Sequence, residues 1–126
     1  MNIPENLLYS SDHEWVRLED NKAIIGITDY AQDALGDVVF VDLPNIGGMV
    51  DSGQSITEVE STKSVSDIYA PIPGKIVEVN HDLVDSPELL NDDPYGEGWI
   101  CAIEMVDNSL VSELLTAEQY GELIES

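Results

Sequence analysis

The most informative segment of this chain reads Glu60-Ser61-Thr62-Lys63-Ser64-Val65-Ser66-Asp67. It joins two runs of β-prone residues, 54–60 and 65–69. Small hydroxyl residues between such runs are typical of a tight turn. The segment therefore predicts a β-hairpin with Lys63 at or beside its tip.

The remainder of the chain has the same rhythm, with Gly, Pro and Asn between apolar runs of about five to seven residues, which is typical of an all-β unit. The predicted strands span residues 14–19, 22–27, 37–43, 54–60, 65–69, 75–80 and 99–105. We expect the apolar run 38–41 to be covered on both faces. We expect the more polar run 54–60 to lie near an edge or a rim.

Helices are predicted at two places. Residues 28–35 form a short helix with Thr28 or Asp29 as its cap and Gly36 as a left-handed stop. Near the C-terminus, helical spacing is shown by Leu110, Val111, Leu114 and Leu115. Residues 116–119 read Thr-Ala-Glu-Gln, a capping box that opens a second helix through Leu123.

The length of 126 residues supports one hydrophobic core rather than two. We therefore expect a mainly β chain that forms a single domain over residues 1–126. Its core strands span about 14–105, and a C-terminal helical extension spans about 107–126.

The chain is strongly acidic, with 26 Asp and Glu against four Lys and Arg and a formal net charge of −22. This charge repels nucleic acids and anionic membranes. The aliphatic runs argue against disorder. Two interpretations of the acidity stay open: a solvated surface, which includes adaptation to high salt, and steering toward basic docking surfaces.

Cys101 is the single cysteine, so an intramolecular disulfide is excluded and a reducing compartment is favoured. It alternates with Ile103 along a predicted strand, which indicates a buried thiol. No metal site is expected, because His13, His81 and one cysteine are too few ligands for zinc. No apolar run reaches the ~18 residues of a membrane span, and no leader segment is visible, so we expect a cytoplasmic protein.

Lys63 is the candidate functional residue. A nucleophilic lysine must be neutral at working pH, whereas Glu60 and Asp67 beside Lys63 favour its ammonium form. A protruding, charged lysine is instead an accessible target for an acyl-transferring ligase. The residues alone favour this interpretation and an ordinary surface lysine about equally.

The motifs in the rest of the chain favour the interpretation of Lys63 as a modification target. The ordered segments are residues 12–16 (Asp-His-Glu-Trp-Val), 25–32, 36–44, 60–67, 70–71, 74–80 and 91–99, the last ending Pro-Tyr-Gly-Glu-Gly-Trp. Together they resemble the glycine cleavage system H protein family over nearly the whole chain. The Glu-Ser-x-Lys context at residues 60–63 differs from the Asp-Lys-Ala of lipoyl domains in 2-oxoacid dehydrogenases and from the Ala-Met-Lys-Met of biotin carriers.

The resemblance implies a barrel-sandwich hybrid fold, as in lipoyl and biotinyl domains, and a carrier that is not itself an enzyme. Lys63 would hold lipoic acid through an amide bond, attached by a lipoate ligase or a lipoyl or octanoyl transferase. The carrier would take the aminomethyl group of glycine from a pyridoxal-phosphate glycine decarboxylase to an aminomethyltransferase. It would then present its dithiol to a dihydrolipoyl dehydrogenase. Glu14 and Asp67 match positions that receive the loaded arm, and Asp12 is a neighbouring candidate.

Two alternatives remain. The first is a lipoyl relay or donor protein that serves lipoate assembly through the same Lys63. The second is an acidic interaction module that keeps the fold without a lipoyl arm.

Overall fold

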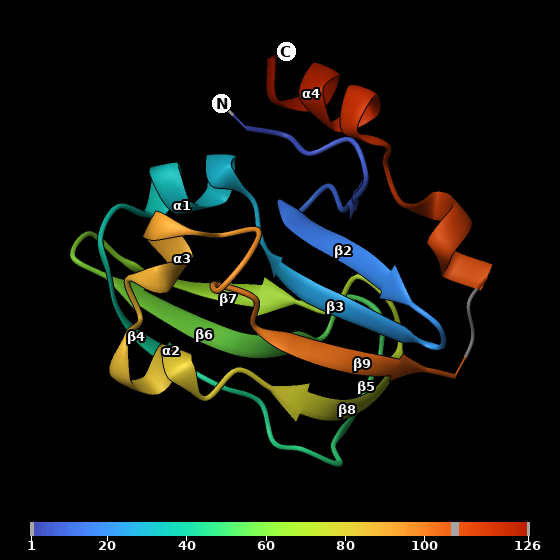
Figure 1. The fold of residues 1–126 in the computed structure, drawn as a ribbon, viewed down its shortest axis with the longest axis horizontal. Coiled ribbons are helices and arrows are strands. Elements are labelled where there is room, and N and C mark those ends of the chain that lie inside the picture. Colours follow the sequence, from blue (N-terminus) through green and yellow to red (C-terminus); the bar gives the residue numbers. More distant parts are fainter. Residues whose placement is uncertain (1, 107–108, 126) are drawn as a thin grey trace.

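The computed structural model describes residues 2–106 and 109–125 of the chain. The strands of these residues form two antiparallel sheets (Figure 1). The larger sheet has the order β1 (Leu8–Tyr9), β2 (Glu14–Glu19), β3 (Lys22–Ile27), β9 (Cys101–Met105), β8 (Gly74–Val79), β5 (Met49–Val50). The smaller sheet has the order β4 (Val38–Asp42), β6 (Ser55–Ser61), β7 (Val65–Tyr69).

The main hydrophobic core lies between the two sheets. Its buried side chains come from both, including Ile25 and Ile103 of the larger sheet and Val59 and Ile68 of the smaller one. No strand pairing joins the two sheets within the described residues, so they form a sandwich rather than a closed barrel. The prediction of a mainly β chain is confirmed.

Several strand predictions match residue for residue. The bounds of β2, β3 and β7 agree with the predicted runs, and β4, β6, β8 and β9 differ from them by one or two residues at an end. The sequence reading missed the two-residue strands β1 and β5 and the four-residue helices α2 (Asp82–Asp85) and α3 (Leu89–Asp92). Elements this short hold too few residues to show a hydrophobic period.

Two expectations about strand environment are wrong. Val39 and Phe40 are 54% and 51% exposed, because a register shift between Val38 and Phe40 turns two consecutive side chains outward. The polar strand β6 is the central strand of its sheet and not an edge. Its acidic side chains, Glu58 and Glu60, are exposed, so polarity here marks a solvated face.

The predicted helix before β4 is confirmed as α1 (Asp29–Leu35). The hydroxyl of Thr28 accepts a hydrogen bond from the Ala31 amide at 3.2 Å, as expected of an N-cap. Gly36 ends the helix at φ +81° and ψ −159°. This region is almost restricted to glycine, but it is not the left-handed helical conformation that we expected.

The C-terminal segment contains a 3₁₀ helix, η1 (Ser109–Glu113), followed by α4 (Ala117–Glu125). The capping box is confirmed: Thr116 and Gln119 exchange hydrogen bonds between backbone and side chain, at 3.0 and 3.2 Å. Helix α4 lies beside the N-terminal segment (Figure 1), where Tyr120 packs with Leu7 and Tyr9. Residues 107, 108 and 126 and the side chain of Leu110, parts of the predicted helical extension, lie outside the described residues.

Gly26 is a sensitive point of the larger sheet because it lies opposite Trp15. A Cβ at Gly26 would lie 2.6 Å from three atoms of the fully buried Trp15 indole, whose Nε1 donates to the Pro94 carbonyl. We expect Gly26→Ala to lower the free energy of unfolding by about 1–3 kcal/mol. Urea unfolding followed by tryptophan fluorescence measures it.

The matched control is Gly121→Ala in helix α4. There the nearest described atom, Ile3 Cδ1, lies at an ordinary 3.7 Å from the added Cβ. Alanine has the higher helix propensity, so this variant should be equally or more stable, by up to about 1 kcal/mol. If both variants lose the same stability, steric conflict with Trp15 is not the cause.

Candidate functional site

Lys63 lies in the turn between β6 and β7, so the hairpin prediction is confirmed. The hydroxyl of Ser61 organises the turn: it accepts from the amides of Lys63 and Ser64 at 3.2 and 3.1 Å. The Thr62 amide donates to the Asp37 carbonyl at 3.0 Å and ties the turn to the segment before β4. The backbone beneath Lys63 is therefore fixed, although the turn is exposed.

The aliphatic stem of Lys63 lies across Gly36 at the end of α1. A Cβ at Gly36 would lie 3.1 Å from Cε and 3.3 Å from Cδ of Lys63. The absence of a side chain at residue 36 makes room for the stem. Lys63 makes no ion pair with any described residue, whereas Arg17 pairs with Glu19 and Lys22 with Glu78.

A cleft of about 260 Å³ adjoins the hairpin. One wall comes from β7 and the residue before it, with Ser64, Ser66 and Asp67. The opposite wall is apolar and comes from helix α1, with Ala31, Ala34 and Leu35. A third part of the lining, its polar end, comprises Asp12 and His13 from the loop before β2 and Tyr30 from α1. This cleft suits an aliphatic chain that ends in a polar or cationic group.

Asp67, one of the two predicted arm-docking residues, lines the cleft. It is exposed on β7 opposite Glu58, and its carboxylate accepts a hydrogen bond from the Ser55 hydroxyl at 3.2 Å. Asp12 also lines the cleft. The structure thus brings Asp67 and Asp12, from distant segments, to one cavity.

Glu14, the other predicted residue, is only 1% exposed and is not among the residues that line the cleft. Its carboxylate accepts from the Ser10 hydroxyl at 2.7 Å and from the Tyr69 amide at 3.4 Å, so it joins the start of β2 to the end of β7. Burial raises the pKa of this carboxyl to about 7. The hydrogen bond from Ser10 lowers this pKa and the nearby charge of Asp12 raises it, both less than burial does.

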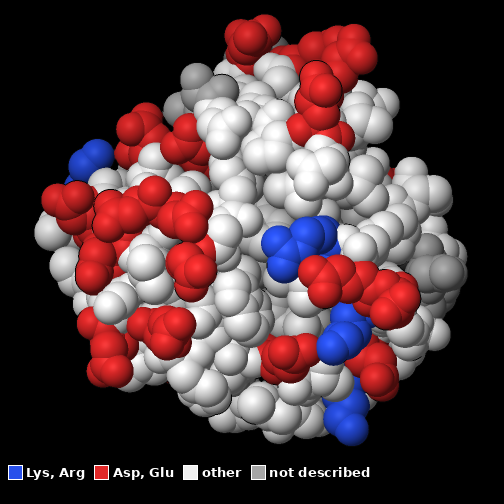
Figure 2. Space-filling view, viewed as in Figure 1, with Lys and Arg blue, Asp and Glu red and all other residues white. Residues whose placement is uncertain are grey.

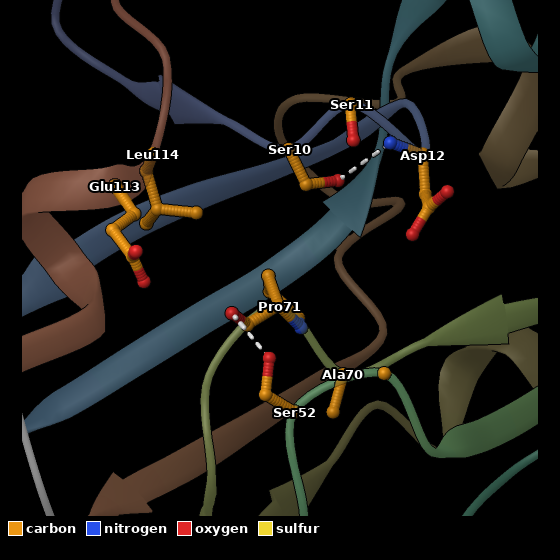
Figure 3. Close-up of a pocket in the computed structure, with 9 residues that line it drawn as sticks. Ser10, Ser11, Asp12, Ser52, Ala70, Pro71, Glu113 and Leu114 are labelled. Atoms are coloured by element: carbon orange, nitrogen blue, oxygen red, sulfur yellow. Dashed lines mark hydrogen bonds between the residues drawn. The ribbon is translucent and has the colours of Figure 1, made fainter.

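A second, more polar cavity of about 200 Å³ shares Asp12 with the cleft (Figure 3). Ser10 and Ser11 line it from the loop before β2, Ser52 from the turn before β6, and Glu113 from η1. The Ser10 oxygen accepts from the Asp12 amide at 3.2 Å (Figure 3), and its proton goes to Glu14. The two cavities therefore meet in the loop that also holds the buried carboxyl.

The remaining candidates do not form a site. Cys101 is buried, as predicted, and burial raises the pKa of its thiol to about 12, so it stays protonated. No group of three or more His, Cys, Asp or Glu side chains in the described residues has the arrangement of a metal site. Acidic side chains are spread over the visible face, with a few basic ones among them (Figure 2).

Sequence reasoning missed most of the cleft wall. Tyr30 and the alanines of α1 were not predicted to line a cleft, because that position depends on how α1 packs beside β7. Tyr120 was not predicted as part of the site either: its hydroxyl bonds His13, which is 107 positions away in the sequence.

Residues 7–126 match the family model described as glycine cleavage H-protein. The chain belongs to this family. It is 54% identical over 125 residues to the glycine cleavage system H protein of Coprothermobacter proteolyticus, with 98% of each chain covered. It is 50% identical over 125 residues to that of Listeria monocytogenes, covering 99% of this chain and 100% of the relative.

The crystal structure of a glycine cleavage system H protein from Mycobacterium marinum superposes with a TM-score of 0.90 at 44% identity, covering 98% of this chain and 100% of that one. The family resemblance and the barrel-sandwich fold expected from it are confirmed. As an H-protein family member, the chain is a carrier component of glycine cleavage, and H proteins are lipoyl carriers. The helices in the described part of the chain are all too short or too polar to span a lipid bilayer.

The buried carboxyl of Glu14 predicts a specific pH dependence of stability. Its pKa is 4.5 when unperturbed and about 7 in the folded chain, so the folded state binds the proton more tightly. The stability from this protonation is fully present below pH 4.5 and is lost as pH rises through 7. Between pH 5 and pH 8, the free energy of unfolding of wild type should therefore fall by roughly 2–3 kcal/mol more than that of Glu14→Gln.

Urea unfolding of both proteins at the two pH values measures this difference. The comparison cancels the contribution of the other carboxylates, because the two proteins share them. Glu58→Gln, at an exposed position on β6, should show no such change relative to wild type. A wild-type to Glu14→Gln difference that is equal at pH 5 and pH 8 would show that Glu14 titrates normally.

Proposed function

We propose that Lys63 holds lipoic acid in amide linkage and that this chain carries the aminomethyl group of glycine between the enzymes of glycine cleavage. The observation that carries the proposal is an exposed lysine without an ion-pair partner among the described residues, on a fixed turn that borders a cleft. The partners are a pyridoxal-phosphate glycine decarboxylase, an aminomethyltransferase and a dihydrolipoyl dehydrogenase. A lipoate ligase, or a lipoyl or octanoyl transferase, attaches the group.

The residues around Lys63 fit this group. Lys63 is exposed on a turn whose backbone the Ser61 hydroxyl and the Asp37 carbonyl hold, so a ligase would meet a fixed target. Gly36 leaves room for the stem, which a larger residue would displace. When bound, the lipoyl group would supply a disulfide, one sulfur of which can carry the aminomethyl group while the other is a thiol; a dithiol would remain only after the group has been passed on.

The cleft gives the carried group a protected position. Ala31, Ala34 and Leu35 cover an aliphatic chain, and Asp67 and Asp12 offer carboxylates to an ammonium. Glu14 does not line the cleft, but it follows His13 in the sequence, and a cation bound near its buried carboxyl would favour the ionised form. Tethering on Lys63 raises the effective concentration of the cargo at each partner's active site.

We also infer that residues 1–126 act as one carrier domain. The C-terminal segment supports this inference because it packs on the N-terminal strands: Tyr9 and Leu115 exchange two backbone hydrogen bonds, at 2.8 and 2.7 Å. Removal of α4 would also remove Tyr120, which belongs to the same buried cluster as Tyr9 and Trp15.

Substitution of the lysine tests the attachment site. We expect Lys63→Arg to accept no lipoyl group from a lipoate ligase with ATP, because a guanidinium is not acylated under these conditions. Lys75→Arg, at an exposed position on β8, should gain one lipoyl amide as wild type does. Intact and peptide mass spectrometry identify the modified residue, and a wild-type protein modified elsewhere would contradict the assignment.

Reconstitution then separates glycine cleavage from the lipoyl relay. Lipoylated wild type should support glycine-dependent release of carbon dioxide with the glycine decarboxylase, whereas Lys63→Arg should not. A lipoylated chain that supports no decarboxylation but transfers its lipoyl group to another carrier protein would favour the relay. A chain left unmodified in a host that lipoylates its other carriers would favour the acidic interaction module.

Asp67 tests the cleft. Loss of one carboxylate from the ammonium site removes about 1 kcal/mol of docking energy, so Asp67→Asn should release the aminomethyl group to water about fivefold faster. Asp42→Asn is the matched control, because Asp42 is exposed on β4 and is not among the residues lining the cleft. Formaldehyde release after rapid removal of the partner enzymes measures the rate, and equal rates in the two variants would contradict the role.

A further inference from the structure

His13 lies where the cleft meets the C-terminal helix. It lines the polar end of the cleft, and its backbone has φ +70°, which is uncommon for a residue other than glycine. Its Nδ1 is 2.8 Å from the hydroxyl oxygen of Tyr120 in α4. The same oxygen is 2.7 Å from the hydroxyl of Thr28, the N-cap of α1. One hydrogen-bonded chain thus joins α1, α4 and the cleft.

The direction of this chain follows from counting protons. Thr28 is fully buried, and its oxygen already accepts from the Ala31 amide. Among the described residues, the Tyr120 oxygen is the one acceptor within reach of the Thr28 proton. A buried hydroxyl proton without an acceptor costs about 1–3 kcal/mol. Thr28 therefore donates to Tyr120.

Tyr120 must then donate to His13. Its side chain is fully buried, and burial raises its pKa to about 12, so the phenol keeps its proton. The oxygen accepts from Thr28, and the remaining partner within hydrogen-bond distance is Nδ1 of His13. An Nδ1 that accepts carries no proton, so a neutral His13 carries its proton on Nε2.

We propose that Tyr120 acts as a positioning residue that holds His13 as the Nε2–H tautomer, so that helix α4 places a hydrogen-bond donor at the polar end of the cleft. In this position it serves the oxygen and sulfur acceptors of a lipoyl-lysine arm, a role that rests on the function proposed above. No described residue bonds Nε2, so this donor is free for a ligand.

The neutral form of His13 suits the cargo. Burial lowers the pKa of this imidazole, against the smaller opposite effect of Asp12. A neutral donor does not repel an ammonium, which leaves Asp12 and Asp67 to bind it.

The packing around Tyr120 explains how α4 holds the ring. Tyr120 stacks on Tyr9 with ring centroids 4.8 Å apart and planes at 10°. His13 meets the edge of Tyr120 at 5.7 Å and packs on Tyr30 at 4.6 Å. The phenol is thus fixed between two rings, and its hydroxyl has little freedom to turn away.

The first test uses the full-length, unlipoylated wild-type protein with ¹⁵N-labelled histidine. Two-bond ¹H–¹⁵N correlations distinguish the two tautomers above the pKa of the ring. We expect His13 to be entirely Nε2–H, and exposed His81, the other histidine of the chain, serves as an exchanging reference in the same spectrum. A wild-type His13 in the Nδ1–H form, or in a mixture like that of His81, overturns the proposal.

The second test is Tyr120→Phe, which keeps the ring stack and removes the hydroxyl. We expect a measurable Nδ1–H population of His13 in this variant. Tyr9→Phe is the matched control: it removes a hydroxyl of the same stack that bonds the Pro4 carbonyl, and it should leave His13 unchanged. A Tyr120→Phe protein that folds and keeps His13 wholly in the Nε2–H form overturns the positioning role.

The third test uses the lipoylated proteins. Water attack on the carried R–S–CH₂–NH₃⁺ breaks the C–S and C–N bonds and gives thiol, formaldehyde and ammonium. We expect this loss to be several-fold faster in Tyr120→Phe than in Tyr9→Phe, and equal rates overturn the role toward the arm. Failure of Lys63 to accept a lipoyl group would overturn the carrier proposal, whereas the tautomer experiments would still decide whether Tyr120 positions His13.

Discussion

The site depends above all on the pairing of β6 with its two neighbours. Lys63 leaves the hairpin where Ser61 still pairs with Val38 of β4, and the Thr62 amide is bound by the carbonyl before that strand. The inner face of the same sheet packs into the core against the larger sheet. A lysine at the end of a free two-stranded hairpin would move with it, because such hairpins are marginally stable alone. The third strand therefore makes Lys63 an exposed side chain on a fixed base.

The same sheet also sets the electrostatic character of the site. Its outer face carries Asp42, Glu58 and Asp67 in neighbouring positions on the three strands. Like charges across strands reduce stability, and a net charge of −22 adds repulsion over the whole surface. Such a surface fits both interpretations of the acidity, a solvated surface and steering toward partners with basic docking surfaces. The net charge thus bears on partners and solubility rather than on the fold.

The features that sequence reasoning predicted are those encoded by neighbouring residues. Turn residues between apolar runs gave the bounds of β2, β3 and β7, hydroxyl residues around a lysine gave the hairpin, and Thr116 with Gln119 gave the start of α4. The predicted environments of β4 and β6 were wrong because burial depends on strand order, which local patterns do not encode. The candidate site shows the same division between local and long-range features. The position of Lys63 followed from eight consecutive residues, whereas the burial of Glu14 requires Tyr69, which is 55 positions away.

The buried carboxyl of Glu14 reduces the stability of the folded chain. A buried carboxyl with a pKa of about 7 is partly ionised at neutral pH in a place that disfavours its charge, so its burial there reduces stability. The Ser10 hydroxyl and the Tyr69 amide offset this cost only in part, since the pKa remains raised.

An ammonium bound near Glu14 changes that balance, because an opposite charge stabilises the ionised carboxyl. In the proposed role, the free energy recovered on docking is then available to a cationic cargo and absent for the neutral dithiol left after its transfer. The cleft would then favour the charged cargo over the neutral dithiol, and this preference would protect the cargo and release the arm once the cargo is gone.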